Sequence, residues 1–155
     1  MILLDTSGLL AAFFPDQNRH AECLRALRDA EPPRLMSPLV LAELDYMIVK
    51  YAGVEAEVQF LAEVVTGVYE VSSVTTQHII NAQEVIARHR DLRIGLADAM
   101  TVVLAQHYNC RDVLTLDERH FRVLRFSART PFRLLPSDSS PSARTTRARA
   151  RSLRP

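Results

Sequence analysis

The chain has 155 residues, enough for one domain with a buried core and too few for two domains of ordinary size. Hydrophobic residues make up 48% of it and charged residues 24%, and no apolar run approaches the roughly 18 residues that a membrane span requires. The first residues lack the pattern of a secretory signal, so we expect a soluble cytoplasmic protein with no membrane partner. Cys23 and Cys110 stand apart from each other, and their spacing indicates neither a disulfide framework nor a zinc site.

The charge is distributed unevenly along the chain. The whole chain carries +1, but residues 137–155 contain five arginines and one aspartate, which leaves −3 on residues 1–136. Serine, proline, arginine and threonine dominate residues 137–155, so this Arg/Ser/Pro-rich tail lacks the apolar surface needed to offset its ordering entropy. We therefore predict one domain over residues 1–136 and a disordered tail, which is either a basic arm for nucleic acid or a dispensable extension.

Strand-like and helix-like patterns alternate along the first 136 residues. Apolar residues 2–4 predict a short buried strand, and helical spacing follows from Ser7 to about Phe14. Ser37 before Pro38 is typical of a helix start, because serine caps helices and proline fits their first turn. Periodicity and breaker residues predict further helices over residues 17–30, 38–51, 54–66, 76–90 and 96–107, and further strands over residues 34–37, 68–73, 112–116 and 131–136. This alternation predicts the α/β class, with a mainly parallel sheet covered on both faces.

Four acidic residues stand within or directly after apolar runs. Asp5 ends the first predicted strand, Asp117 follows the fourth, and Asp98 lies in the first turn of the helix after Gly95. Glu43 lies in a helix so apolar around it that we expect its carboxylate to be kept from open water. Ligand sites of open parallel sheets lie beyond the carboxyl ends of the strands, so we expect the four carboxylates at one end of the sheet.

Each acid alone has a structural explanation. Asp5 suits a helix cap, Asp98 suits the positive end of a helix dipole, Glu43 suits a boundary position and Asp117 suits the start of a turn. These roles do not explain why all four are directed to one end of the sheet. Like charges in a dry cleft require protons or cations, and oxygen-only ligands favour Mg²⁺ or Mn²⁺. Such a metal site points to phosphodiester or phosphoryl chemistry.

The segments that carry these acids, "ILLDTSGLLAAFF", "SPLVLAELDYMI", "RIGLADAMTVVLA" and "VLTLDERHF", together resemble the PIN-domain ribonucleases, and specifically the VapC toxins of toxin–antitoxin pairs. The resemblance covers residues 1 to about 136 and implies a three-layer α/β/α fold with a five-stranded, mainly parallel sheet. It implies that catalysis and metal binding belong to four acids supported by two hydroxyl side chains. In this sequence the three core acids match Asp5, Glu43 and Asp98, the more variable fourth acid matches Asp117, and the hydroxyl positions match Thr6 and Thr115.

The resemblance also implies an activity and partners. VapC toxins are metal-dependent endoribonucleases that cut structured RNA, such as tRNA or the sarcin–ricin loop of ribosomal RNA, and so inhibit translation. They leave a 5′-phosphate and a 3′-hydroxyl, are usually homodimers and are neutralised by a VapB antitoxin. Apolar residues of the helix over 54–66 would line an antitoxin groove or would simply be core: Val58, Leu61, Val64 and Val65. Four residues that flank Asp98 and Asp117 are candidates for RNA binding or are ordinary surface charges: Arg93, Arg119, His120 and Arg122.

Two other functions compete with this interpretation. One is a non-catalytic PIN-like module that binds a partner or RNA, against which the presence of all four acids argues. The other is a haloacid-dehalogenase-like phosphotransferase, which needs a second acid two positions after the first; Ser7 occupies that position here. A dinucleotide-binding function is excluded, because the four glycines form no GxGxxG after the first strand.

Overall fold

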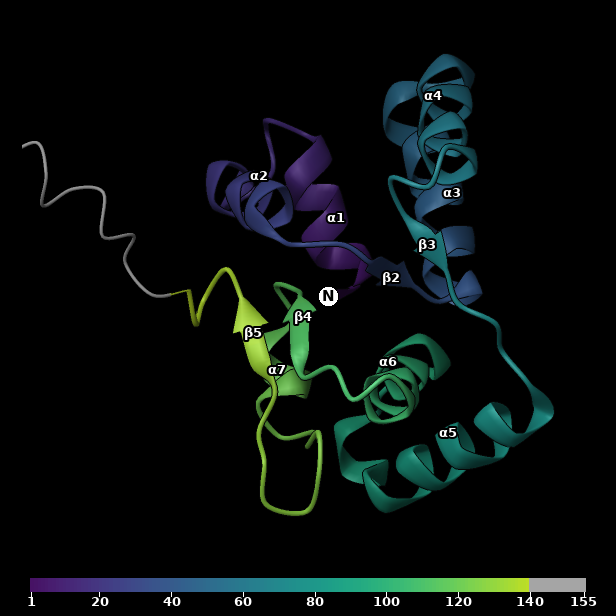
Figure 1. The fold of residues 1–155 in the computed structure, drawn as a ribbon, viewed down its shortest axis with the longest axis vertical. Coiled ribbons are helices and arrows are strands. Elements are labelled where there is room, and N and C mark those ends of the chain that lie inside the picture. The colour runs from purple at the N-terminus through teal and green to yellow at the C-terminus, as the bar shows by residue number, and fades with distance from the viewer. Residues whose placement is uncertain (140–155) are drawn as a thin grey trace, which may run out of the picture.

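The computed structural model describes residues 1–139, and residues 140–155, most of the predicted tail, lie outside the described part. Figure 1 shows the elements in chain order, and residues 136–138 form a turn after the last strand. The elements are β1 (Ile2–Leu4), α1 (Thr6–Phe13), α2 (His20–Asp29), β2 (Arg34–Met36), α3 (Pro38–Ala52), α4 (Val54–Val65), β3 (Glu70–Val71), α5 (Thr76–Arg88), the 3-10 helix η1 (Arg90–Leu92), α6 (Leu96–His107), β4 (Asp112–Leu114), α7 (Glu118–Phe121) and β5 (Arg133–Leu135).

The five strands form one parallel sheet in the order β3-β2-β1-β4-β5. The predicted α/β class and the mainly parallel five-stranded sheet are therefore confirmed. β1 and β4 are neighbours at the centre, with Leu4 paired to Leu114. Because the strands run in the same direction, the residues that follow Leu4 and Leu114 leave the sheet at the same edge.

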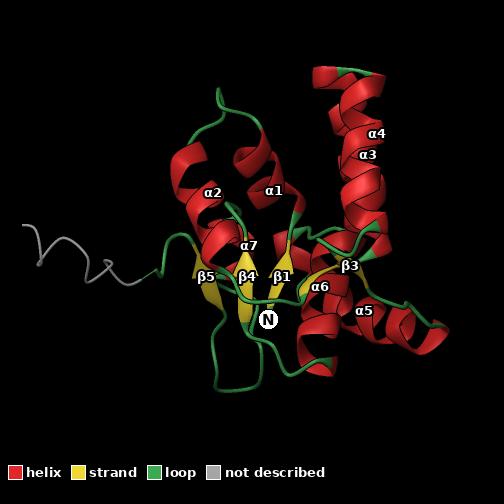
Figure 2. Ribbon diagram, turned by 45° about the horizontal axis from the view of Figure 1, so that its top comes forward, coloured by secondary structure: helices red, strands yellow, loops and turns green. Residues whose placement is uncertain are grey.

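Helices cover both faces of this sheet, as Figure 2 shows, and alternate strand residues pack against different helices. On one face, Leu3, Leu35, Val113 and Leu134 share a core with residues of α5 and α6. On the other, Ile2, Leu4, Met36 and Leu114 pack with residues of α1, α2, α3 and α4. The predicted three-layer α/β/α arrangement follows directly from this alternation.

The α3–α4 hairpin extends beyond the sheet (Figures 1 and 2). Val40, Leu44 and Ile48 form the buried stripe of α3, and Phe60 is buried on α4. Ser37 caps α3 as predicted, since its Oγ accepts a hydrogen bond from the Val40 backbone N–H at 3.1 Å. Among residues 1–139, no helix is both long enough and apolar enough to cross a membrane.

Two short elements were missed by the sequence interpretation. Both η1 and α7 span four residues or fewer, too few for a helical period to show in the sequence. The helix expected from Thr76 does begin there, but Thr75 is the capping residue: its Oγ1 accepts from the backbone N–H of His78 at 3.3 Å. Of these elements, α7 matters most for function, because it directly follows Asp117.

Candidate active site

Asp5 follows β1 and is buried, with 6% of its surface exposed. Its Oδ2 accepts hydrogen bonds from Ser7 Oγ at 2.6 Å and from Thr115 Oγ1 at 2.8 Å. Asp5 occupies the N-cap position of α1, but its side chain makes no capping hydrogen bond with the backbone of this helix. The capping role therefore does not explain this carboxylate, and its contacts are with the hydroxyls behind it.

Burial raises the pKa of Asp5 above its ordinary value, the charge of Asp98 raises it further, and the hydrogen bonds from Ser7 and Thr115 lower it. Burial is the largest of these influences, so the ionised carboxylate is disfavoured in its metal-free surroundings. A divalent cation would remove this penalty by supplying the missing opposite charge. The environment of Asp5 thus fits a cation-binding carboxylate.

Glu43 projects from α3, where its Oε2 accepts a hydrogen bond from Thr6 Oγ1 at 2.6 Å. The expectation that apolar neighbours would keep Glu43 from water is wrong, because Glu43 is exposed. The buried stripe of α3 runs through Val40 and Leu44, and Glu43 lies beside that stripe rather than within it. Thr6 and Glu43 are thereby joined at the solvent side of the site.

Asp98 lies in the first turn of α6 and is half-buried. Its Oδ2 accepts a hydrogen bond from the backbone N–H of Gly95 at 3.1 Å, so it does stabilise the start of this helix. Burial raises the pKa of Asp98, and the charges of Asp117 and Glu43 raise it further, against the lowering effects of Gly95 and His120. Asp98 also raises the pKa of Asp5, so Asp98 interacts electrostatically with each of the other three predicted acids. Within residues 1–139, only Asp98 and Asp117 of the four acids belong to a group with the spacing of metal ligands.

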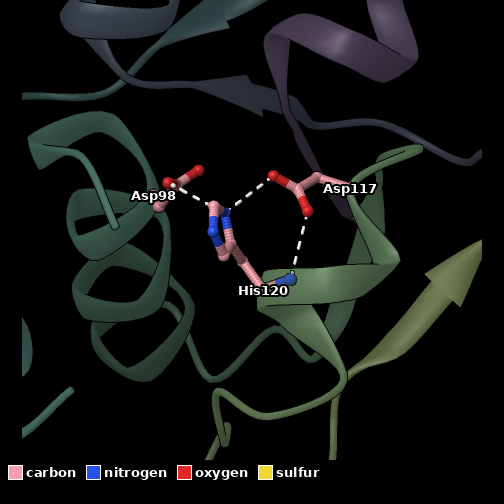
Figure 3. A group of neighbouring side chains, drawn as sticks. All are labelled: Asp98, Asp117 and His120. Atoms are coloured by element: carbon pink, nitrogen blue, oxygen red, sulfur yellow. Dashed lines mark hydrogen bonds and ion pairs between the residues drawn. The ribbon is translucent and has the colours of Figure 1, made fainter. Parts of the chain in front are cut away.

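Asp117 follows β4 and begins α7, as Figure 3 shows, where its Oδ1 accepts from the backbone N–H of His120 at 3.1 Å. The Nδ1 of His120 lies 2.8 Å from Oδ2 of Asp117 and 3.6 Å from Oδ2 of Asp98. One donor atom from each of these three residues fits within a 4.8 Å spread. His120, expected as an RNA contact or an ordinary surface charge, thus lies beside Asp98 and Asp117.

Two hydroxyl side chains connect Asp5 to the chain around Asp117. Thr115 Oγ1 accepts from the backbone N–H of Asp117 at 2.9 Å, and Ser7 Oγ accepts from that of Leu116 at 3.0 Å. Thr115 was predicted at such a position, whereas Ser7 was missed. The signal that would have found Ser7 is its place two residues after Asp5, on the first turn of the helix that leaves the strand.

The three arginines predicted to flank the site have different surroundings. Arg93 is exposed, with a positive φ of 54° between η1 and α6, and Arg119 is exposed on α7. Arg122 is bound by two acids: its Nη2 lies 3.0 Å from Glu118 Oε2 and 2.8 Å from Asp138 Oδ1. Arg93 and Arg119 are therefore exposed cations, whereas Arg122 is part of an ion-pair network.

This chain belongs to the PIN-domain family, whose model matches residues 2–126. It is also 40% identical over 138 residues to Ribonuclease VapC26 of Mycobacterium tuberculosis, a match that covers 87% of this chain and all of the relative. Both findings support the family resemblance that the four acidic segments indicated.

Solved structures agree on the fold. The crystal structure of VapC20 of Mycobacterium tuberculosis, described as a sarcin–ricin loop cleaving toxin, matches with a TM-score of 0.69 and 24% identity over 76% of this chain and 90% of that one. A toxin–antitoxin complex from Klebsiella pneumoniae matches with a TM-score of 0.61 and 18% identity over 81% of this chain and 94% of that one. The layered arrangement is thus shared with structures of toxins.

Proposed function

We propose that this protein is a metal-dependent endoribonuclease and the toxin of a toxin–antitoxin pair. The observations that carry the proposal are the buried carboxylate of Asp5, which Thr115 connects to the backbone of Asp117, and the donor atoms of Asp98 and Asp117, which lie within 4.8 Å of each other. We assign Glu43 to the same site, because Thr6, the residue after Asp5, donates a hydrogen bond to it. The 40% identity to a protein named as a ribonuclease supports the reaction class. A non-catalytic module would have no need to keep an ionisable group buried beside other acids.

The four carboxylates would hold one or two Mg²⁺ or Mn²⁺ ions. Burial raises the pKa of both Asp5 and Asp98, and a bound cation would stabilise their ionised forms. These carboxylates are therefore suited to binding a divalent cation. When bound, such an ion supplies a Lewis acid for a phosphoryl oxygen and lowers the pKa of a bound water. Carboxylate oxygens suit both Mg²⁺ and Mn²⁺.

Hydrogen bonds within the protein orient two of the carboxylates that would bind the metal. Ser7 and Thr115 fix the direction of the Asp5 carboxylate, and the Gly95 backbone N–H fixes that of Asp98. Glu43 lies at the exposed side, where the RNA phosphate and the attacking water arrive. Attack by water on phosphorus expels the 3′-oxygen of the preceding nucleotide, so the products carry a 5′-phosphate and a 3′-hydroxyl.

Arg93 and Arg119 are the groups that we assign to RNA phosphates, because both are exposed and both lie close in sequence to a site acid. We expect a structured RNA as the substrate, either a tRNA or the sarcin–ricin loop, which VapC20 is described as cleaving. Loops of folded RNA present splayed bases, which suits a site formed by a few residues at one sheet edge.

Cleavage of total RNA by purified protein tests this function directly. We expect cleavage that requires added Mg²⁺ or Mn²⁺ and stops with a chelator, and we expect Asp98→Asn to slow it at least about a hundredfold, because metal catalysis supplies several kcal/mol. Asp16→Asn, an exposed position outside the site, serves as the matched control and should leave the rate unchanged. Mapping of new 5′ ends would identify the RNA, and equal rates for wild type and Asp98→Asn would exclude the assigned centre.

The antitoxin is assigned to the outer face of α4. Val58 is 60% exposed and Val65 is 87% exposed, and with Leu61 they recur at helical spacing on one side of the helix. Val64, by contrast, is partly buried and packs against the core. Of the four apolar residues, Val64 therefore belongs to the core, and the other three are available to a partner. An amphipathic antitoxin segment fits such an apolar face.

A double Val58→Glu/Val65→Glu variant tests this surface. We expect it to lose co-purification with the antitoxin and to keep RNA cleavage, because both side chains already face solvent and neither belongs to the proposed site. Ile79→Glu on α5, where the isoleucine is 49% exposed, is the matched control and should keep the antitoxin. Retention of the antitoxin by the α4 variant would contradict the assignment. The predicted homodimer can be measured on the same samples by light scattering.

A further inference from the structure

His120 presents a buried nitrogen to two acids of the site. Its side chain is 18% exposed, and Nδ1 itself is buried without a hydrogen-bond partner among residues 1–139, although Asp117 Oδ2 lies 2.8 Å away. In Figure 3 the imidazole lies between the carboxylates of Asp98 and Asp117, with Nδ1 linked to both. The sequence interpretation placed this residue among RNA contacts, and the proposed mechanism above makes no use of it.

Helix capping does not account for this placement. The helix-capping role at α7 is performed by Asp117 Oδ1 and the His120 backbone N–H, which leaves the ring free to turn elsewhere. The Nδ1 atom lies at ion-pair distance from both carboxylates but forms no hydrogen bond with either. A buried polar nitrogen without a hydrogen bond costs about 1–3 kcal/mol, and a ligand between the three side chains would remove this cost. A metal ion held by the same two carboxylates is a partner that a neutral imidazole nitrogen binds well.

The distances suit a shared ion. Two adjacent ligand atoms of an octahedral ion, each about 2.1 Å from it, lie about 3 Å apart. The Nδ1 atom lies 2.8 Å from Asp117 Oδ2 and 3.6 Å from Asp98 Oδ2. The first distance matches that separation, and the second exceeds it by a few tenths of an ångström. Small side-chain adjustments would therefore bring all three atoms onto one ion.

We propose that His120 Nδ1 is a nitrogen ligand of a divalent ion that Asp98 and Asp117 also bind, and that it makes this part of the site prefer Mn²⁺ to Mg²⁺. Mg²⁺ selects oxygen ligands, whereas affinity for imidazole rises along the first transition row, so one nitrogen in the ligand set shifts the preference. The proposal rests on the metal centre of the proposed function and adds a ligand and a metal preference to it.

Pulsed electron paramagnetic resonance of the full-length protein with Mn²⁺ detects nitrogen bound directly to the metal. We expect ¹⁴N modulation in the wild type, its loss in His120→Asn, which places an amide near the position of Nδ1, and its retention in His107→Asn at the far end of α6. Absence of ¹⁴N modulation in the wild type, or its persistence in His120→Asn, would overturn the proposal.

Calorimetric titrations of the same proteins with Mn²⁺ and Mg²⁺ test the preference. Loss of a group that only supports a metal ligand already lowers affinity about 10–100-fold, so we expect the loss of a ligand in His120→Asn to weaken Mn²⁺ binding at least about tenfold. We expect the affinity for Mg²⁺ to fall less than about threefold. Equal losses of affinity for the two ions would overturn the claimed preference. These readouts are independent of RNA: nitrogen-bound Mn²⁺ without RNA cleavage would refute the proposed function alone, and metal-dependent cleavage without nitrogen coordination would refute His120 alone.

Discussion

The two sides of the acidic site are held in place in different ways. Asp5 stands at the end of a central strand, buried against hydroxyls that belong to α1 and to the residue after β4. His120 instead belongs to a four-residue helix that Asp117 caps, and their neighbours Glu118 and Arg122 form a surface ion pair. The core therefore fixes one side of the site, and polar contacts near the surface fix the other.

The core side depends on a very close approach of α1 to β4. A Cβ atom added at Gly8 would lie 2.5 Å from the backbone oxygen of Leu114, a separation that real Cβ atoms do not reach. The absence of a side chain at Gly8 thus lets Ser7 contact both Asp5 and the backbone N–H of Leu116. Side-chain volume at a single position decides whether this side of the site can form.

The other side depends on the turn that follows β5. Ser137 Oγ donates to Glu118 Oε1 at 2.5 Å, Arg19 Nη1 donates to Ser137 Oγ at 2.8 Å, and Arg122 joins Glu118 to Asp138. This network holds α7, which carries His120 and directly follows Asp117, against the sheet edge. Its members are exposed enough for water to compete, so each pair contributes little stability alone.

The largest expected effect comes from Asp5→Asn on the core side. We expect RNA cleavage to fall at least about a hundredfold, because a neutral amide is a far weaker ligand for a divalent cation than a carboxylate. We also expect the metal-free variant to unfold at a higher temperature than wild type at neutral pH. Thermal denaturation in a chelator and cleavage assays with metal would measure the two effects on one preparation.

The higher unfolding temperature expected for metal-free Asp5→Asn should depend on pH, in the direction that the pKa shift of Asp5 sets. Because burial raises the pKa of Asp5, the folded metal-free protein binds a proton at this carboxyl more tightly than the unfolded chain does. The stability of the wild type therefore falls as the pH rises from the pKa of Asp5 in the unfolded chain through its pKa in the folded protein. The Asp5→Asn variant has no carboxyl at this position and does not lose this stability. The advantage of Asp5→Asn should vanish below about pH 4 and should be offset by saturating Mg²⁺, which binds folded wild type. A variant less stable than wild type at pH 7 without metal would contradict this account of Asp5.

A second, smaller effect is expected from Gly8→Ala. The clash with Leu114 should destabilise the protein by about 1–3 kcal/mol, as overpacking of a core does, measured by urea denaturation. Gly67→Ala is an informative comparison, because Gly67 has a φ of 80° but nothing within 4 Å of an added Cβ. The Gly67→Ala control should lower the free energy of unfolding by only about 1 kcal/mol, because alanine disfavours a positive φ, and it should keep full activity. Equal losses at the two positions would mean that α1 can shift without difficulty.

Each side of the site was only partly predictable from the sequence. Asp5, Asp98 and Asp117 could be placed near one another because apolar runs predict strands and helices, and parallel strands end at one edge. Ser7 was missed because its hydrogen bond to Leu116 joins residues 109 positions apart. The role of His120 depends on α7, which is too short to produce a periodic signal. Apolar neighbours of Glu43 suggested burial, but they face the core from another side of α3.

The smallest expected effect on stability comes from Arg122→Gln on the α7 side. Loss of its pairs with Glu118 and Asp138 should cost less than about 1 kcal/mol, and metal-dependent cleavage should fall severalfold because α7 becomes less firmly held. Arg133→Gln is the matched control: it removes a comparable ion pair with Asp112, at the opposite ends of the strands, and should leave cleavage unchanged.

Asp138→Asn then separates two explanations for any loss at Arg122. If Arg122 acts by holding α7, Asp138→Asn should reproduce the fall in cleavage, because it weakens the same network from the other end. If Arg122 instead contacts an RNA phosphate, Asp138→Asn frees its guanidinium, and the KM for RNA should stay equal or fall. A severalfold lower kcat with unchanged KM in both variants would assign the surface network to positioning, and would show that the less buried side of the site is held by the turn after β5.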